Sequence, residues 1–182
     1  MKAKSLTKFA PMWFIAAAVM IQPARSEAAE VAAAFSPGIA GTTAEALVIE
    51  TIDSARQSIR LAAYYFTSKP IAQALVDAKR RGVDVKAVLD KENLVKSYSG
   101  AQYLANSDIP VRIDSEYSTM HNKFLIVDSQ TVQTGSFNYT EAATRSNAEN
   151  VIVVRNHASF AQEYDAEWLR LWRESEPLQR RN

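Results

Sequence analysis

The 182-residue sequence contains no cysteine and only two histidines. The absence of cysteine excludes disulfides, thiolate zinc sites, iron–sulfur clusters and a cysteine nucleophile. Two histidines leave little room for a histidine-rich metal site. An excess of charge of either sign is also missing, because 21 Lys and Arg residues meet 20 Asp and Glu residues and leave a formal net charge of +1. A uniformly basic nucleic-acid-binding protein is therefore excluded, although a local cationic site is not.

The sequence does contain enough apolar material for a folded domain. Hydrophobic residues make up 47% of the chain, which excludes wholesale disorder. The length fits one domain with a short extension. Since no disulfide is available, the hydrophobic core must stabilise the fold by itself, and about 150 residues are enough for that.

The first thirty residues are typical of a cleaved secretory signal. Three lysines among the first eight residues precede an apolar stretch from Phe9 to Ile21, which is short for a bilayer span. Small residues then surround two candidate cleavage sites, after Ser26 and after Ala28. An uncleaved membrane anchor is the alternative interpretation.

We predict a signal peptide over residues 1–28 and a mature domain over residues 29–182. The mature protein is expected to be periplasmic or secreted, with no stable membrane association after cleavage. Cleavage after Ala28 would remove four cations and one anion, leaving 17 basic and 19 acidic residues and a net charge of −2.

Predicted strands and helices alternate along the mature chain, which favours an α/β fold. Apolar runs predict strands at residues 31–35, 59–66, 83–89, 111–113, 123–127, 131–134 and 151–154. Helical spacing and capping residues predict helices after Thr42 or Thr43, from Pro70 to Gly82, around residues 101–105 and over residues 160–172. The strand–helix–strand–helix–strand order of residues 31–89 predicts a mixed, mostly parallel β-sheet flanked by helices, and residues 123–134 predict a hairpin.

The residues that carry chemistry begin with a His-x-Lys-x4-Asp pattern formed by His121, Lys123 and Asp128. Side chains alternate along a strand, so His121 and Lys123 should project an imidazole and an ammonium from the same face. Two cationic groups disfavour each other unless an anion lies between them, and a phosphodiester suits that place. We expect Lys123 to offset the phosphate charge and His121 to attack phosphorus or transfer a proton. Asp128 ends the strand and should point to the opposite face from His121 and Lys123, so we expect it to stabilise the turn.

A second group of polar residues follows the next predicted strand. Ser136 and Asn138, in a Gly-Ser-x-Asn sequence, offer a hydroxyl and an amide to phosphate oxygens. Glu149 stands just before the last predicted strand. A carboxylate that accepts a hydrogen bond from His121 would fix the tautomer of the imidazole and raise its basicity.

Each of these residues also has a purely structural interpretation. His121 could be a loop histidine, and Glu149 could be a surface carboxylate. Ser136 and Asn138 could cap a helix that starts near Thr140. The order of the motifs along the chain favours the functional interpretation.

The two motifs resemble the signature of the phospholipase D superfamily, His-x-Lys-x4-Asp followed by Gly-Ser-x-Asn. Further stretches are similar to the short, secreted, single-motif bacterial group of Nuc-type endonucleases, namely Ser36-Pro37-Gly38, Tyr64-Tyr65-Phe66-Thr67-Ser68 and Arg81-Gly82-Val83. The similarity runs from Val31 onward. Members of the superfamily cleave or exchange phosphodiesters in lipids and in nucleic acids, so the signature is specific for the chemistry rather than for the substrate.

The resemblance implies a phospholipase D-like fold and a covalent phosphohistidine intermediate. Such a mechanism needs one histidine as nucleophile and another as general acid, and the superfamily takes one from each of two motifs. Here the motif occurs once, and His157 is expected at the surface near a helix start. The resemblance therefore implies a homodimer in which His121 and Lys123 of two subunits meet on a twofold axis. Neither a metal nor a cofactor is expected, because the lysines would offset the phosphate charge.

We therefore predict an exported, metal-independent endonuclease that hydrolyses DNA with little sequence specificity, with RNA left open as a substrate. A mature charge near −2 requires cations to cluster at the site, and Lys91, Lys96 and Arg112 are candidates for its rim.

One alternative function is that of a phospholipase D-type lipid phosphodiesterase or phosphatidyl transferase, which the lack of an obvious membrane-binding helix disfavours. The other is a non-catalytic protein that binds nucleic acid or phosphate on the same scaffold.

Overall fold

A computed structural model describes residues 28–38, 41–95 and 99–181. Apart from Ala28, the predicted signal peptide lies outside the described residues, and so does Lys96. Within the described ranges, no helix is both long and apolar enough to cross a bilayer.

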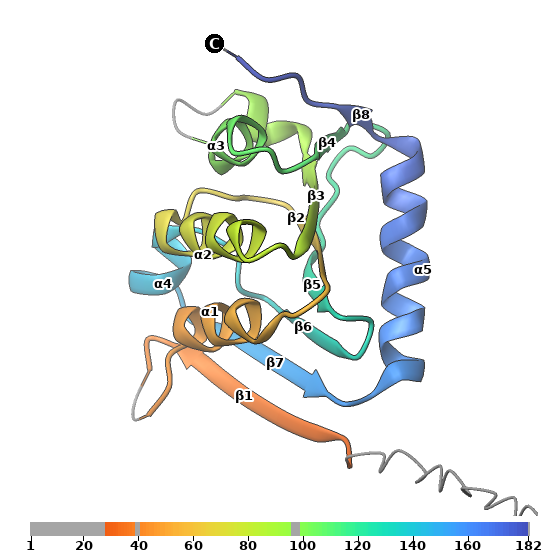
Figure 1. The fold of residues 1–182 in the computed structure, drawn as a ribbon. Helices are drawn as coiled ribbons and strands as arrows, with labels where there is room; N and C mark the ends of the chain where they lie inside the picture. Colours follow the sequence, from red (N-terminus) through yellow and green to blue (C-terminus); the bar gives the residue numbers. More distant parts are fainter. Residues whose placement is uncertain (1–27, 39–40, 96–98, 182) are drawn as a thin grey trace, which may run out of the picture.

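The predicted strands and helices are present with small differences in their bounds (Figure 1). A 3₁₀ turn at Lys91–Leu94 and a short strand at Glu176–Pro177 were not predicted. The strands are β1 (Glu30–Ser36), β2 (Ser58–Ala63), β3 (Asp84–Asp90), β4 (Val111–Asp114), β5 (Lys123–Val127), β6 (Thr131–Gly135), β7 (Glu149–Arg155) and β8 (Glu176–Pro177). The helices are α1 (Ala44–Ser54), α2 (Lys69–Arg80), the 3₁₀ turn η1 (Lys91–Leu94), α3 (Gly100–Asn106), α4 (Glu141–Arg145) and α5 (Ala158–Glu174).

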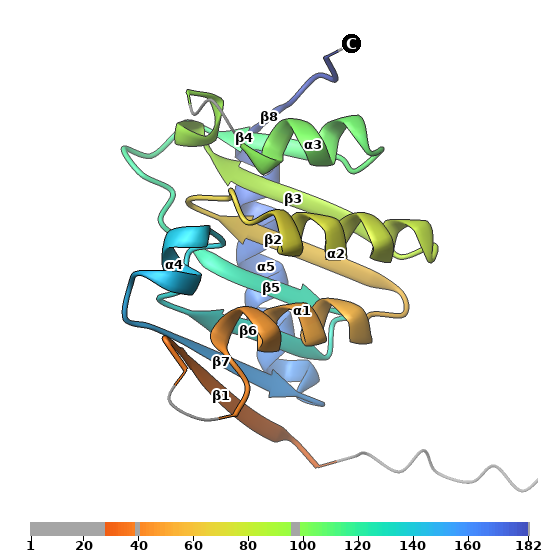
Figure 2. The same cartoon turned by 90° about the vertical axis from the view of Figure 1, so that its left-hand side faces the viewer.

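All eight strands form one sheet in the order β1-β7-β6-β5-β2-β3-β4-β8. Helices α1, α2 and α3 cover one face of the sheet, and α5 crosses the other face (Figures 1 and 2). The predicted class, a mixed α/β sheet flanked by helices, is therefore confirmed.

The expectation of a mostly parallel sheet is wrong. Two neighbouring pairs, β2–β3 and β3–β4, are parallel, whereas the other five pairs in the described chain are antiparallel. The reason is that β7, β6 and β5 lie between β1 and β2. The βαβ order predicted the common direction of β1 and β2 correctly, but it carried no information on the strands inserted between them.

Local signals explain where the helices begin and end. The Thr43 hydroxyl accepts a hydrogen bond from the Ala46 N–H at 3.2 Å and caps α1. The Ser68 hydroxyl accepts from the Ile71 N–H at 3.3 Å and caps α2. Gly82 follows α2 with a φ of 92°, the left-handed conformation that glycine adopts most easily.

The sheet separates two hydrophobic cores, and β5 contributes to both. Leu125 and Val127 pack in the core under α1, α2 and α3, while Phe124 and Ile126 pack under α5. This alternation confirms the predicted inward orientation of Phe124 and Ile126 and places Lys123 on the same side as Leu125. The Trp168 indole of α5 donates to the Leu61 carbonyl at 2.8 Å and ties α5 to the sheet.

Candidate active site

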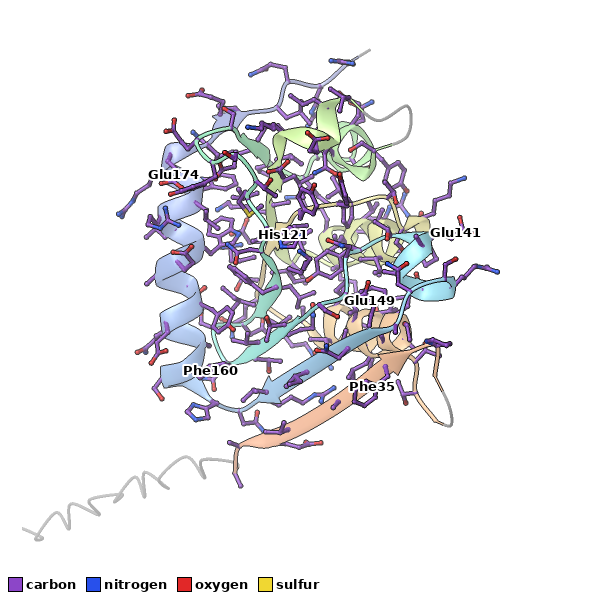
Figure 3. All side chains as sticks on the ribbon, turned by 180° about the vertical axis from the view of Figure 1, so that it is seen from behind. Phe35, His121, Glu141, Glu149, Phe160 and Glu174 are labelled. Carbon is purple, nitrogen blue, oxygen red and sulfur yellow. The ribbon has the colours of Figure 1, made fainter. Side chains whose placement is uncertain are left out.

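The candidate site lies at the edge of the sheet where β2 and β3 end and β5 begins. The loop of residues 115–122 connects β4 to β5 and carries His121 to this edge. Figure 3 shows His121 and Glu149 from this side of the molecule. In sheets with parallel strands, ligands commonly bind outside the carboxyl ends of those strands.

His121 presents an exposed imidazole on a fixed backbone. Its ring centroid lies 4.7 Å from that of Tyr64, the residue that follows β2. The Tyr64 N–H donates to the Asn122 carbonyl at 2.9 Å, and the Lys123 ammonium donates to the His121 carbonyl at 2.7 Å. The imidazole is therefore open to a ligand while the peptide groups beside it are anchored.

Lys123, the first residue of β5, is only 8% exposed. No carboxylate among the described residues forms an ion pair with it, and its ammonium lies 5.2 Å from the centroid of the Tyr64 ring. Burial lowers the pKa of Lys123, and the charge of Glu149 opposes that shift. An ammonium in this setting is suited to an anionic ligand. The structure thus brings His121 and Lys123 together, and the Tyr64 ring lies against both side chains.

Ser136 and Glu149 form a hydrogen-bond network at the adjacent strand ends. The Ser136 hydroxyl donates to Glu149 Oε2 at 2.5 Å, and the Asn147 amide donates to Glu149 Oε1 at 2.9 Å. The Ser136 oxygen accepts from the backbone N–H of Asn150 at 3.1 Å. Gly135 permits this close approach, because a Cβ at that position would lie 2.3 Å from the Asn150 carbonyl oxygen.

The hydrogen bond expected between Glu149 and His121 is absent from the described chain. Both carboxylate oxygens of Glu149 are engaged by Ser136 and Asn147 instead. Within one chain, Glu149 therefore acts on Lys123 through its charge.

Ser136 and Asn138 do not cap the helix that follows them. The Thr140 hydroxyl accepts from the Ala143 N–H at 3.1 Å and caps α4 itself. The Oδ1 atom of Asn138 is buried without a hydrogen-bond partner in the described chain. Buried polar atoms are rarely left in that state, so Asn138 has an unused acceptor beside the site.

Asp128 has the structural role expected for it, but over a longer range. Its carboxylate accepts the backbone N–H groups of Arg56, Gln57 and Ser58 at 2.9, 2.7 and 2.8 Å. It therefore holds the connection between α1 and β2 against the β5–β6 hairpin.

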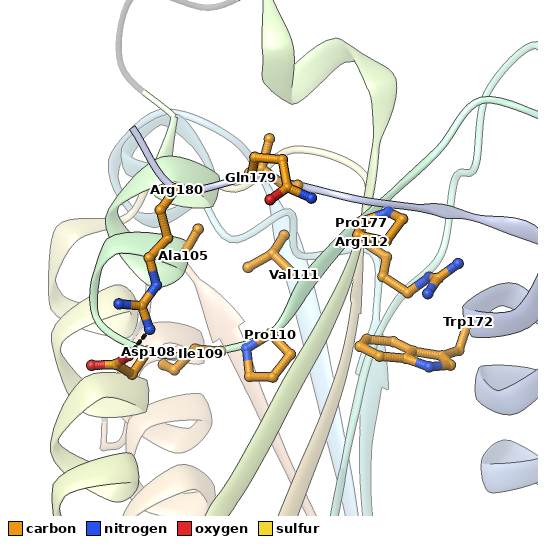
Figure 4. A pocket seen from close by; sticks show the side chains of 11 residues that line it. Ala105, Asp108, Ile109, Pro110, Val111, Arg112, Trp172, Pro177, Gln179 and Arg180 are labelled. Carbon is orange, nitrogen blue, oxygen red and sulfur yellow. Dashed lines mark ion pairs between the residues drawn. The ribbon is translucent and has the colours of Figure 1, made fainter. Parts of the chain in front are cut away.

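Two of the three cationic residues predicted for the rim are described by the structure, and only Lys91 lies near the site. Lys91 follows β3 at the same edge of the sheet and donates to the Tyr117 carbonyl at 2.8 Å. Arg112 is placed elsewhere: its guanidinium donates to the Ser175 carbonyl and stacks 5.3 Å from the Trp172 ring. There it lines a separate groove of about 470 Å³ (Figure 4).

His157 is exposed at the start of α5, as expected. Its N–H donates to the carbonyl of Gln130, in the turn at the far end of the β5–β6 hairpin. Its ring nitrogen accepts the Phe160 N–H at 3.3 Å and caps α5. Among the described residues, no three His, Cys, Asp or Glu side chains form a group suited to a metal ion.

Sequence reasoning missed two residues of the site, Tyr64 and Asp90. In the sequence, Tyr64 stands out only within a family-like stretch, and Asp90 is not singled out. The available signal was their position, since each stands at the carboxyl end of a buried strand of the parallel part of the sheet.

Comparison with known proteins agrees with this geometry. Residues 48–172 match the family described as cardiolipin synthase, PLD-like domain. The structure of Nuc, a phospholipase D family member from Salmonella typhimurium, superposes with a TM-score of 0.80 and 42% identity, covering 84% of this chain and 99% of Nuc. The chain therefore belongs to the phospholipase D superfamily, in its Nuc-type group.

Two curated relatives are longer than this chain. A phospholipase D of Rickettsia bellii is 44% identical over 122 residues, which are 67% of this chain and 60% of that protein. A mitochondrial cardiolipin hydrolase of Xenopus tropicalis is 33% identical over 123 residues, which are 68% of this chain and 58% of that protein. The chain thus spans about three fifths of the length of these relatives.

Proposed function

We propose that the protein is an exported, metal-independent endonuclease that hydrolyses phosphodiester bonds of DNA at a site shared by two subunits. One observation carries the proposal: a single chain assembles one His121–Lys123 pair, whereas its other histidine, His157, caps α5 at the far end of the hairpin. The Nuc-type similarity over nearly the whole of the Salmonella protein supports nucleic acid as the substrate.

The first chemical step is an in-line displacement at phosphorus. A ring nitrogen of His121 attacks, a nitrogen–phosphorus bond forms, and the bond from phosphorus to the leaving oxygen breaks. His121 of the partner subunit gives its proton to that oxygen as general acid. Lys123 of each subunit and the Asn138 amide hold the negative phosphoryl oxygens, and the Ser136 hydroxyl joins them when its hydrogen turns from Glu149 to the phosphate.

The second step is hydrolysis of the phosphohistidine. The imidazole that gave up its proton now accepts one from water, so it acts as general base. The water oxygen bonds to phosphorus, the nitrogen–phosphorus bond breaks, and His121 is regenerated. The exposed imidazole of His121 in the single chain is consistent with a site that needs a second chain to complete it.

The test is cleavage of plasmid DNA by the purified mature protein in excess EDTA. The parent should nick the plasmid, and the His121→Ala variant should not. His157→Ala is the matched control, because it removes the other histidine and should leave cleavage intact. Cleavage that requires added Mg²⁺ would contradict the metal-independent mechanism.

A lipid phosphodiesterase is the second candidate. Two relatives are named phospholipase D and cardiolipin hydrolase. Leu94 and Val95 are also 50% and 77% exposed, next to Asn93, whose amide donates to the Tyr64 carbonyl at the site. Release of headgroup from phosphatidylcholine or cardiolipin vesicles, with no plasmid cleavage, would favour this function.

A further inference from the structure

The loop that carries His121 is anchored to the ends of two buried strands. Asp90 and Asp114 are the last residues of β3 and β4 and lie opposite each other in register. Their side chains are almost completely buried, at 0% and 1% exposure. A buried carboxylate is unfavourable unless hydrogen bonds compensate it, so the partners of these two residues are informative.

Asp90 binds backbone groups from two separate segments. Its Oδ1 accepts the Glu92 N–H at 2.8 Å, and its Oδ2 accepts the Met120 N–H at 2.7 Å. No cation forms an ion pair with it among the described residues. The second hydrogen bond holds the backbone N–H of Met120, the residue before His121, and a neutral acceptor would hold it less strongly.

The hydrogen bond to Asp90 is one of three that hold the backbone of residues 120–122. Residue 120 is held by Asp90 of β3, the carbonyl of residue 121 by Lys123 of β5, and the carbonyl of residue 122 by Tyr64 at the end of β2. Three consecutive residues are thus fixed from three different strands or strand ends. The imidazole of His121 projects from this frame and lies against the Tyr64 ring.

We propose that Asp90 is a positioning residue that fixes the attacking imidazole of His121 through the Met120 N–H; this inference rests on the function proposed above. Asp114 has a different place in the loop, since it accepts the Glu116 N–H at 3.0 Å near the start of the loop. Asp90 therefore controls the end of the loop at which the chemistry occurs. It does not touch the substrate.

The test compares Asp90→Asn with Asp84→Asn, using bis(p-nitrophenyl) phosphate as a small phosphodiester that is neither lipid nor nucleic acid. In Asp90→Asn, the side-chain NH₂ faces either the Met120 or the Glu92 N–H, so one of the two hydrogen bonds is lost. Asp84→Asn removes a carboxylate at the other end of β3, where Asp84 pairs with Arg60 and Lys86.

The expected result is a loss of about 100-fold in kcat for Asp90→Asn, from a small displacement of the nucleophile. Its KM should change by no more than about twofold, because Lys123 and Ser136 remain in place. Asp84→Asn should keep the kcat of the parent. An Asp90→Asn protein that melts cooperatively and keeps its kcat would overturn the proposal, and so would an equal loss in Asp84→Asn.

A measurement on the parent protein covers the case in which Asp90→Asn does not fold. Amide hydrogen exchange should be slow at Met120 and fast at the neighbouring exposed residues Ser118 and Thr119. Fast exchange at Met120 would overturn the proposal without any variant. If the parent hydrolyses no phosphodiester, the proposed function fails instead, and the exchange rate still reports on the link between Asp90 and Met120.

Discussion

Ser136 donates its hydroxyl hydrogen to Oε2 of Glu149 at 2.5 Å and so joins the end of β6 to the start of β7. The other carboxylate oxygen accepts from Asn147. Glu149 therefore orients the Ser136 hydroxyl, and its charge raises the pKa of Lys123 against the lowering effect of burial. One carboxylate thus serves two neighbouring groups of the site, and this dual role can be tested.

Replacement of Glu149 by Gln should move the alkaline limb of the pH–rate profile to lower pH. The proposed mechanism needs the charged form of Lys123, whose pKa is lowered by burial from the ordinary value of 10.5. Loss of the Glu149 charge removes the influence that raises this pKa, so Lys123 should lose its proton at lower pH. The measurement is kcat/KM for bis(p-nitrophenyl) phosphate from neutral pH to pH 10.5. A limb that stays in place or moves upward would contradict the coupling.

Replacement of Lys123 by Met should abolish activity and make the protein more stable. Lys123 is buried without an ion-pair partner among the described residues, so an apolar side chain of similar length should raise the free energy of unfolding by about 1 kcal/mol. In a protein of this size that is roughly 2–4 °C in Tm. Activity should fall by at least about 100-fold.

The stability gain of Lys123→Met should also depend on pH in a defined direction. Because the pKa of Lys123 is lower in the folded than in the unfolded chain, the unfolded chain binds the proton more tightly. The stability of the parent therefore rises as the pH approaches 10.5, and the advantage of the variant shrinks there. Melting curves at neutral and alkaline pH distinguish this from a simple packing effect, which would give the same advantage at both.

Asp128 should affect stability and leave catalysis intact. Ala at this position removes three hydrogen bonds to a carboxylate and should cost about 3 kcal/mol, or roughly 6–12 °C in Tm. Asn keeps an acceptor for Gln57 and Ser58 and should cost less. Both variants should retain the kcat of the parent well below their melting temperatures. A large loss of kcat in folded Asp128→Asn would assign Asp128 to the chemistry instead.

Gly135 should tolerate no side chain. Its φ of 153° is strained for other residues, and an added Cβ would collide with the Asn150 carbonyl oxygen. We expect Gly135→Ala to lose about 2 kcal/mol or more in stability and to displace Ser136. Gly82→Ala is the control, because its φ is also positive but no atom lies within 4 Å of the added Cβ. Differential scanning calorimetry of both variants separates the collision from the backbone strain.

These residues also show which parts of the structure can be predicted from sequence. The helix start at Thr42 or Thr43, the Gly82 helix end and the β5–β6 hairpin depend on neighbours a few residues away, and all were predicted, with Thr43 as the cap in the structure. The pairing of β1 with β7 joins segments more than a hundred residues apart, so no local pattern could reveal it. The common direction of β1 and β2 was thus predictable, whereas the three antiparallel strands that lie between them were not.

The same distinction applies to the candidate site. Strand alternation placed His121 and Lys123 together, although only Lys123 belongs to β5. Their common contact with Tyr64 depends on the β2–β5 pairing, a long-range feature. Asp128 was expected to brace its own turn, but its partners lie about seventy residues earlier in the chain. The sequence showed which side chains could take part in the chemistry, but it did not show which other residues hold those side chains in position.

A site shared between subunits makes a quantitative prediction for mixed dimers. If each phosphodiester needs His121 from both chains, a dimer with one His121→Ala subunit is inactive. After subunit exchange at equal concentrations, a quarter of the dimers contain two parent chains, so activity per parent subunit should fall to about half. An equal amount of His157→Ala protein should cause no such loss. Activity that stays proportional to the parent protein, or full activity in a monomer, would show that each chain carries a complete site.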